Sequence, residues 1–191
     1  MFRRRPKPQI DPLAHIDPEQ VPHRLRHHVT EALANRARYQ QVVGAMQPGP
    51  IQDRMIANQA RVDAGVEAIW ATVSRIRDIE RTVAALDPDS ISAQLKAARR
   101  AAQAAGREDD ELVSLLMSRF ASTQQLLNAV DDVDDRLSLL DARLGAAVAS
   151  AAELQLLAGS SAGASIDGLE AQLTGVVSDL TSLRDAMGSM S

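Results

Sequence analysis

The sequence predicts an all-α protein: a long antiparallel helical hairpin (a coiled-coil stalk) with a four-helix bundle at its open end. Residues 108–158 contain no proline and a single glycine, Gly145, so they can form one helix of roughly 75 Å. Hydrophobic residues make up 45% of the chain but aromatic residues only 2%, which favours thin helix-on-helix packing over an aromatic-rich core. The long segment also carries a heptad seam with alternating steps of four and three: Leu126, Val130, Val133, Leu137, Leu140, Leu144, Ala147, Ala151 and Leu154.

Residues 1–22 form the first predicted region, a flexible N-terminal arm that is basic and rich in proline. Proline removes a backbone donor and blocks the helix interior, so no long helix can cross this region. It contains five prolines, Pro6, Pro8, Pro12, Pro18 and Pro22.

Residues 23–158 form the predicted hairpin domain. It is divided at Pro48-Gly49-Pro50, Asp87-Pro88 and Gly106. Proline and glycine end helices, and an aspartate such as Asp87 caps the start of the next one. The predicted helices are 23–46, 51–86, 90–105 and 108–158.

The C-terminal region is predicted as a glycine- and serine-rich linker, 159–165, followed by an amphipathic helix over 166–187. Asp167 and Glu170 have capping-box spacing at the start of this helix. We expect the helix to pack on the base of the hairpin or to associate with a second copy.

The topology follows from the lengths of the two arms. Residues 51–105 and 108–158 are nearly equal, so folding at Gly106 would return the chain to its start. The alternative is a full reversal at Pro88, which would pack 90–105 back on 51–86.

The leucine-rich seams predict self-association or binding of a partner helix. Charges beside the seams permit contact between two chains as well as contact within one chain. In a dimer, Arg136 could meet Asp141 of the second chain, and Asp179 could meet Arg184. The seam residues assigned to this contact are Leu137, Leu140, Leu144, Leu169, Leu173, Val176, Leu180 and Leu183.

Residues with catalytic or metal-binding chemistry do not form a recognisable motif. His15, His23, His27 and His28 are interpreted as solvated side chains, because no nearby acid completes a metal site. The acids of Asp131–Asp135 are interpreted as a charged face beside the seam. We therefore expect no enzymatic activity, no cofactor and no bound metal.

The basic tail is the sequence feature best suited to an anionic surface. Arg3, Arg4, Arg5 and Lys7 could contact anionic lipid headgroups weakly. The rest of the chain is acidic and would repel a polyanion, so nucleic acid is not an expected partner. The expected location is the cytoplasm, with the inner face of the membrane as the alternative.

One segment resembles a known group of proteins. Pro48–Met55, Arg61–Val66 and Trp70 resemble a helical, coiled-coil family of high-GC, actinobacterial-type bacteria, to which no activity is attached. The resemblance implies a helical fold and a bacterial setting.

Taken together, these features predict a non-enzymatic structural or interaction protein that acts through coiled-coil self-assembly or through binding of a partner helix. A peripheral membrane scaffold recruited by its basic tail and an adaptor for another helical protein remain the alternatives.

Overall fold

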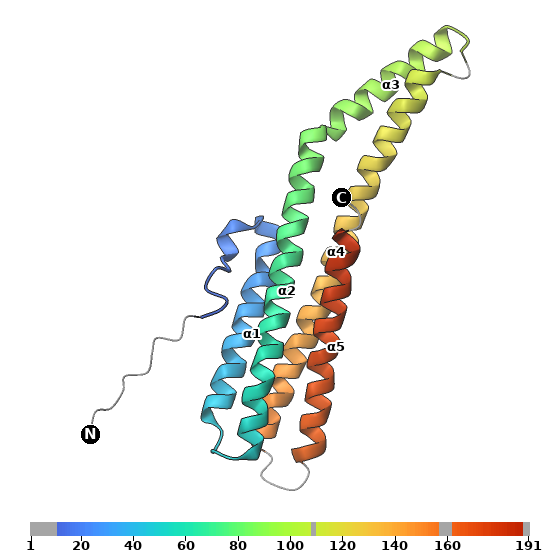
Figure 1. Ribbon diagram of the computed structural model, residues 1–191. Coiled ribbons are helices and arrows are strands. Elements are labelled where there is room, and N and C mark those ends of the chain that lie inside the picture. The colour runs from blue at the N-terminus through green and yellow to red at the C-terminus, as the bar shows by residue number, and fades with distance from the viewer. Residues whose placement is uncertain (1–10, 108–109, 157–161, 189–191) are drawn as a thin grey trace. The chain divides into compact units, whose positions relative to one another are not determined.

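The computed structural model describes residues 11–107, 110–156 and 162–188 and confirms that the protein is all-α (Figure 1). Every regular element in these residues is a helix. Two short 3-10 turns, Pro18–Gln20 and His23–Leu25, precede the α-helices. The α-helices are α1 (Arg26–Ala45), α2 (Pro50–Leu86), α3 (Pro88–Ala104), α4 (Glu111–Leu156) and α5 (Ala162–Gly188).

The helix ends follow the proline and glycine signals closely, with a few differences. Helix α3 begins at Pro88 instead of residue 90, because proline fits the first turn of a helix, where its missing N–H has no partner to lose. The predicted linker 159–165 is too long, since α5 already begins at Ala162. Residues 108–109 and 157–161, where parts of the predicted long helix and linker fall, lie outside the described residues.

The chain divides into two compact units. Unit 1 comprises Met1–Val73 and Leu137–Ser191, and unit 2 comprises Ser74–Arg136. The division therefore falls within α2 and α4, so each of these helices contributes one part to each unit.

Unit 1 contains α1, the first part of α2, the second part of α4, and α5, which lie side by side in Figure 1. Apolar side chains from all four helices are withdrawn from solvent, which provides the main favourable term in folding. The largest fully buried ones include Tyr39, Met55, Ile69, Leu137, Leu144, Leu169, Leu173 and Leu180.

Polar side chains join the helices of unit 1 in pairs. Asp179 accepts from Arg143 of the same chain, whereas its sequence position left contact with Arg184 of a second chain equally open. Such partly exposed ion pairs contribute little stability but favour one relative placement of the helices. The pairs are Arg36–Asp63 at 2.7 Å (α1 to α2), Arg54–Asp167 at 2.5 Å (α2 to α5) and Arg143–Asp179 at 2.7 Å (α4 to α5).

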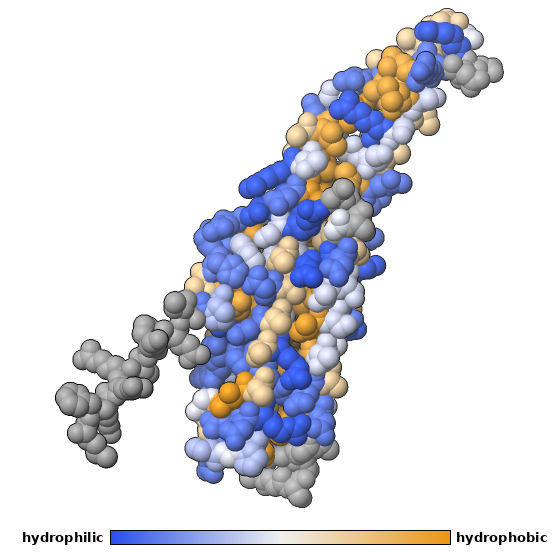
Figure 2. All heavy atoms as spheres, viewed as in Figure 1, coloured by the Kyte–Doolittle hydropathy of each residue, from blue (hydrophilic) through white to orange (hydrophobic). Residues whose placement is uncertain are grey.

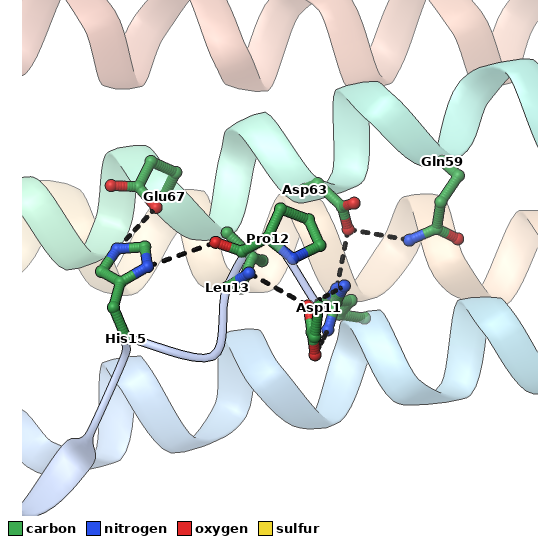
Figure 3. Close-up of polar contacts among 8 residues, drawn as sticks. Asp11, Pro12, Leu13, His15, Gln59, Asp63 and Glu67 are labelled. Atoms are coloured by element: carbon green, nitrogen blue, oxygen red, sulfur yellow. Dashed lines mark hydrogen bonds and ion pairs between the residues drawn. The ribbon is translucent and has the colours of Figure 1, made fainter. Parts of the chain in front are cut away.

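Residues 11–22 correct the prediction of a flexible arm, because they pack against the helices of unit 1 (Figure 3). Asp11 binds the guanidinium of Arg36 with both carboxylate oxygens, at 2.9 and 2.7 Å. The prolines prevent a helix, but they do not prevent irregular backbone from burying apolar side chains. Three of these are buried: Leu13, Ile16 and Val21.

Unit 2 contains the end of α2, helix α3 and the start of α4. At the junction of α2 and α3, Asp87 adopts a left-handed conformation (φ 50°), and its carboxylate accepts from the backbone N–H of Ser90 at 3.1 Å. Figure 1 shows α3 carrying the chain onward from α2 at a bend. The chain turns back at Gly106, whose φ of 63° favours glycine. The alternative of a full reversal at Pro88 is therefore wrong.

Unit 2 leaves several large apolar side chains in solvent. Leu112, Leu115 and Met117 at the start of α4 are 56%, 66% and 46% exposed. Figure 2 likewise shows apolar atoms on the viewed surface of unit 2. The apolar side chains that unit 2 buries are Ile76, Val83, Ile91, Leu95, Ala102, Leu116, Val130 and Val133.

Candidate functional site

A groove of about 710 Å³ lies between α1 and α4 in unit 1. Residues 31–45 of α1 form one wall and residues 141–155 of α4 form the other. Small side chains keep the groove open, because they leave space that leucines would fill. On α4 these are Ala142, Gly145, Ala149 and Ala152.

A buried acid–base pair lies at one end of this groove. Nδ1 of His28 on α1 is hydrogen-bonded to Oδ2 of Asp141 on α4. His28 is fully buried, and Asp141 is 9% exposed and lines the groove. A buried carboxylate is costly unless it is paired, so the contact with His28 explains how Asp141 is tolerated there.

The second carboxylate oxygen of Asp141, Oδ1, is buried without a hydrogen-bond partner among the residues that the structure describes. Burial raises the pKa of Asp141, and the hydrogen bond from His28 opposes this effect. An unpaired buried acceptor costs free energy until a donor reaches it. Surrounding atoms cover Oδ1, so it does not face the open part of the groove.

Asn35 on α1 carries another buried polar atom of this kind. Its side chain is 2% exposed and lines the groove, and its Oδ1 accepts from Nη1 of Arg38 at 2.9 Å. Its Nδ2 is buried and has no hydrogen-bond partner in the described part of the chain. A Cβ atom added to Gly145 would be 3.7 Å from this nitrogen, so the glycine of α4 faces the amide directly.

The rim of the groove carries side chains of both charges. Arg38 forms an ion pair with Glu31 at 3.1 Å, and both side chains are more than half exposed. Gln41 and Gln155 also line the groove. The lining therefore combines polar and charged side chains with small apolar ones, a mixture that is common at protein-binding surfaces.

The seam residues assigned to a partner are buried by the chain itself. In unit 1 their exposed fractions do not exceed 4%, so other helices of the same chain already cover them. A second chain could reach them only if unit 1 opened. These residues are Leu137, Leu140, Leu144, Leu169, Leu173, Val176, Leu180 and Leu183.

The prediction of four solvated histidines is wrong for His28. His15, His23 and His27 are exposed, whereas His28 lies on the buried side of α1 beside Val29. The acids Asp131, Asp132 and Asp135 are exposed in unit 2 and contribute nothing to the groove. In the part of the chain that the structure describes, no group of three or more His, Asp or Glu side chains is placed to hold a metal ion.

Arg3, Arg4, Arg5 and Lys7, the predicted anion-binding residues, lie outside the described residues. Their contact with an anionic membrane therefore stays a prediction. Among residues 11–107, 110–156 and 162–188, no helix is both long enough and apolar enough to cross a bilayer.

Sequence reasoning missed His28, Asn35 and Asp141 as one site, although α1 carries a signal for the first two. Leu25, Ala32 and Tyr39 mark the apolar stripe of α1, and His28 and Asn35 fall on the same stripe at steps of three and four. Polar residues on an otherwise apolar stripe point to a buried polar contact.

No family model, no curated protein and no solved structure matches this chain. The resemblance to a helical actinobacterial family stays a prediction.

Proposed function

We propose that this protein is a non-enzymatic interaction protein whose groove between α1 and α4 accepts a helix of another protein. One observation carries the proposal: a groove of about 710 Å³ runs between α1 and α4, and small or apolar side chains line most of its α4 wall.

The dimensions of the groove suit a helix. Each wall extends over fifteen residues, 31–45 and 141–155, which corresponds to about 21 Å or four helical turns. Alanine and glycine on α4 would let a third helix approach closely, as small residues do wherever helices pack tightly. An amphipathic helix laid in an apolar groove is a common mode of peptide recognition.

The lining residues favour binding over catalysis. They include neither a hydroxyl nor a thiol that could act as a nucleophile. The imidazole of His28 is fully buried, so it supports Asp141 and does not face the groove. The buried pair therefore has a role in positioning Asp141.

Self-assembly through the leucine seams is the weaker form of the proposal. Leu173 and Leu180 are 1% and 0% exposed, so a second copy would have to displace helices of the first. The groove needs no such opening. We therefore place partner-helix binding ahead of self-association through the seams.

We also propose, from the lengths of the sequence segments, that the chain forms an antiparallel hairpin with a four-helix bundle at its open end. The ion pairs Arg54–Asp167 and Arg143–Asp179 support the bundle, because they tie α5 to both α2 and α4 within unit 1.

The test is selection of helical peptides from a display library on the wild-type protein, with counter-selection on Gly145→Leu. Leucine at this position would extend from the floor of the groove toward Asn35 and fill the space. The matched control is Gly175→Leu, because Gly175 lies on the exposed face of α5 with nothing near its Cβ position.

We expect peptides that bind the wild type and Gly175→Leu but lose binding to Gly145→Leu. Ala149→Arg is a second blocking variant, since Ala149 is exposed on the groove wall and its replacement leaves the core intact. If no selected peptide distinguishes the blocked proteins from the control, the proposed function is wrong.

A further inference from the structure

The two walls of the groove between α1 and α4 run in the same direction. His28 is bonded to Asp141, and Asn35, further along α1, lies beside Gly145, further along α4. Figure 1 shows the same arrangement, with α1 and the second part of α4 both running downward in this view. The groove therefore has a direction of its own, and the C-terminal ends of both walls lie at the same end of it.

That end of the groove is electronegative. The last carbonyl groups of a helix have no partner within it, and the aligned peptide dipoles amount to about half a negative charge there. Neither α1, which ends at Ala45, nor α4, whose described part ends at Leu156, has a basic residue in its last turn. Gln52 donates to the carbonyl of Val43 at 3.1 Å, but this amide carries no charge.

The other end of the groove has the opposite polarity, because α1 begins near it. The first N–H groups of a helix carry partial positive charge. Among the described residues no side chain caps α1, and its first turn, which starts at Arg26, contains no acid. The two carboxylates at this end of the groove are already paired, Glu31 with Arg38 and Asp141 with His28.

A helix that lies in the groove has two possible directions, which differ in electrostatic energy. If it is antiparallel to the walls, its positive N-terminal end meets the two negative C-terminal ends, and its own C-terminal end lies toward the start of α1. A parallel helix would place like ends together. The interaction grows as the helices approach, and the small side chains of α4 permit close approach.

We infer that the helix accepted by this groove lies antiparallel to α1 and α4, with its N-terminal end beside Ala45 and Gln155 and its C-terminal end beside Glu31. The inference rests on the proposed function, which supplies the helix, and adds its direction and polarity. Such a partner lacks acidic residues in its first turn, although acids usually stabilise that turn, because here they would face two negative helix ends.

The first part of the test is disulfide cross-linking. The chain contains no cysteine, so one introduced cysteine is a unique reporter. Groove-dependent peptides from the display selection would carry a cysteine at either their N-terminal or their C-terminal end. We would measure their rates of disulfide formation with Gln155→Cys and Glu31→Cys, since both positions line the groove and are exposed. Thr174→Cys, at an exposed position of α5 that does not line the groove, gives the background rate.

We expect peptides with an N-terminal cysteine to link to Gln155→Cys at least tenfold faster than to Glu31→Cys, and peptides with a C-terminal cysteine to show the reverse. The opposite preference, or equal rates above background, would overturn the inference and leave helix docking intact. Rates no faster than those of Thr174→Cys for both variants would overturn the proposed function as well.

The second part tests the electrostatic cause of the direction. Gln155→Lys places a cation at the electronegative end of the groove, where it would repel the N-terminal end of the bound helix. We expect it to weaken the binding of acetylated peptides by about twofold to fivefold at low ionic strength, with a smaller effect in 1 M salt. Fluorescence anisotropy measures the dissociation constants.

Gln155→Glu is the variant of opposite charge and should bind at least as tightly as the wild type. Thr174→Lys is the matched control and should change the affinity less than 1.5-fold, because its added cation lies on α5 outside the groove lining. If Gln155→Lys and Gln155→Glu bound the peptides equally tightly, the helix ends would not set the direction, and the inferred polarity would be wrong.

Discussion

Units 1 and 2 use similar leucine-rich sequences with different results. In unit 1, Leu173 and Leu180 are 1% and 0% exposed, because parts of four helices enclose them. In unit 2, Leu112 and Leu115 are 56% and 66% exposed at the start of α4. Unit 2 also buries Leu95 and Leu116, so its helices cover some leucines and leave others in solvent.

The units also differ in the kind of unfavourable feature that they contain. Unit 1 places unusual polar groups in its interior, with His28 and Asp141 buried across more than a hundred residues of sequence separation. Unit 2 places an unusual backbone conformation at Asp87. Both are costly unless compensated, and each is a point at which one unit can be perturbed without directly altering the other.

The largest effect should come from charging the leucines of each unit in turn. Leu173→Lys with Leu180→Lys places two cations in the core of unit 1, which should cost more than about 5 kcal/mol and unfold it. The matched change in unit 2, Leu112→Lys with Leu115→Lys, should alter the free energy of unfolding by only about 0.5 kcal/mol. Circular dichroism during urea unfolding measures both.

Light scattering on the same variants shows whether Leu173 and Leu180 pack within one chain or against a second chain. If the unit 1 variant stayed helical and only lost mass relative to the wild type, Leu173 and Leu180 would contact a second chain. Equal destabilisation by the two double variants would contradict the contrast between the units.

Much of the helical structure could be predicted because its signals are local. Pro50 begins α2, Pro88 begins α3 and Gly106 closes the turn, each through a preference of its own backbone. Leucine spacing likewise identified the buried faces of α4 and α5.

The candidate site could not be predicted in the same way, because it depends on the register between α1 and α4. Nothing in the spacing of His28 and Asp141 along the chain indicates that they meet. Asp167 makes the same point: its spacing to Glu170 predicted a helix cap, but both acids bind Arg54 of α2. Local patterns identify the residue types, and tertiary packing decides their partners.

The second prediction concerns the bend of unit 2. Asp87→Ala removes the side-chain cap on Ser90 and leaves alanine in a left-handed conformation, which together should cost about 2–3 kcal/mol. Asp87→Asn should cost much less, because asparagine caps helices and tolerates this conformation.

Amide hydrogen exchange would show whether this loss is confined to unit 2. We expect faster exchange in α3 and at the end of α2, with α1 and α5 unchanged. A uniform loss of protection in both units would mean that they unfold as one.

The third prediction uses Tyr39, the single tyrosine of the chain, as a reporter of unit 1. Its hydroxyl donates to the carbonyl of Met55 at 3.0 Å, and burial raises its pKa. Since the folded state holds this proton more tightly than the unfolded chain, its contribution to stability is present below pH 10 and is lost as the pH rises further.

Tyrosinate absorbance should therefore appear together with the loss of helical circular dichroism in alkali. Tyr39→Phe should cost about 1 kcal/mol at neutral pH and should weaken the alkaline dependence. Free titration of Tyr39 in the fully helical protein would contradict its burial.

The smallest effect is expected where residues 11–22 attach to unit 1 (Figure 3). Hydrogen bonds from Arg36 hold the pKa of Asp11 below its usual value of 3.8, and Asp11 also accepts from the N–H of Leu13. A lowered folded-state pKa means that this contribution is present above pH 3.8 and is lost as the pH falls through the folded-state value. Asp11→Asn should therefore speed exchange of the Leu13 amide at neutral pH and remove its dependence on acid.

Asp17→Asn is the matched control, because Asp17 bonds to Glu19 and Gln20 within the same segment. Asp63 still binds Arg36 in the Asp11 variant, so the helices should keep their protection. If the Leu13 amide exchanged equally in both variants, the carboxylate of Asp11 would not be what holds this segment on unit 1, and its buried side chains Leu13, Ile16 and Val21 would suffice.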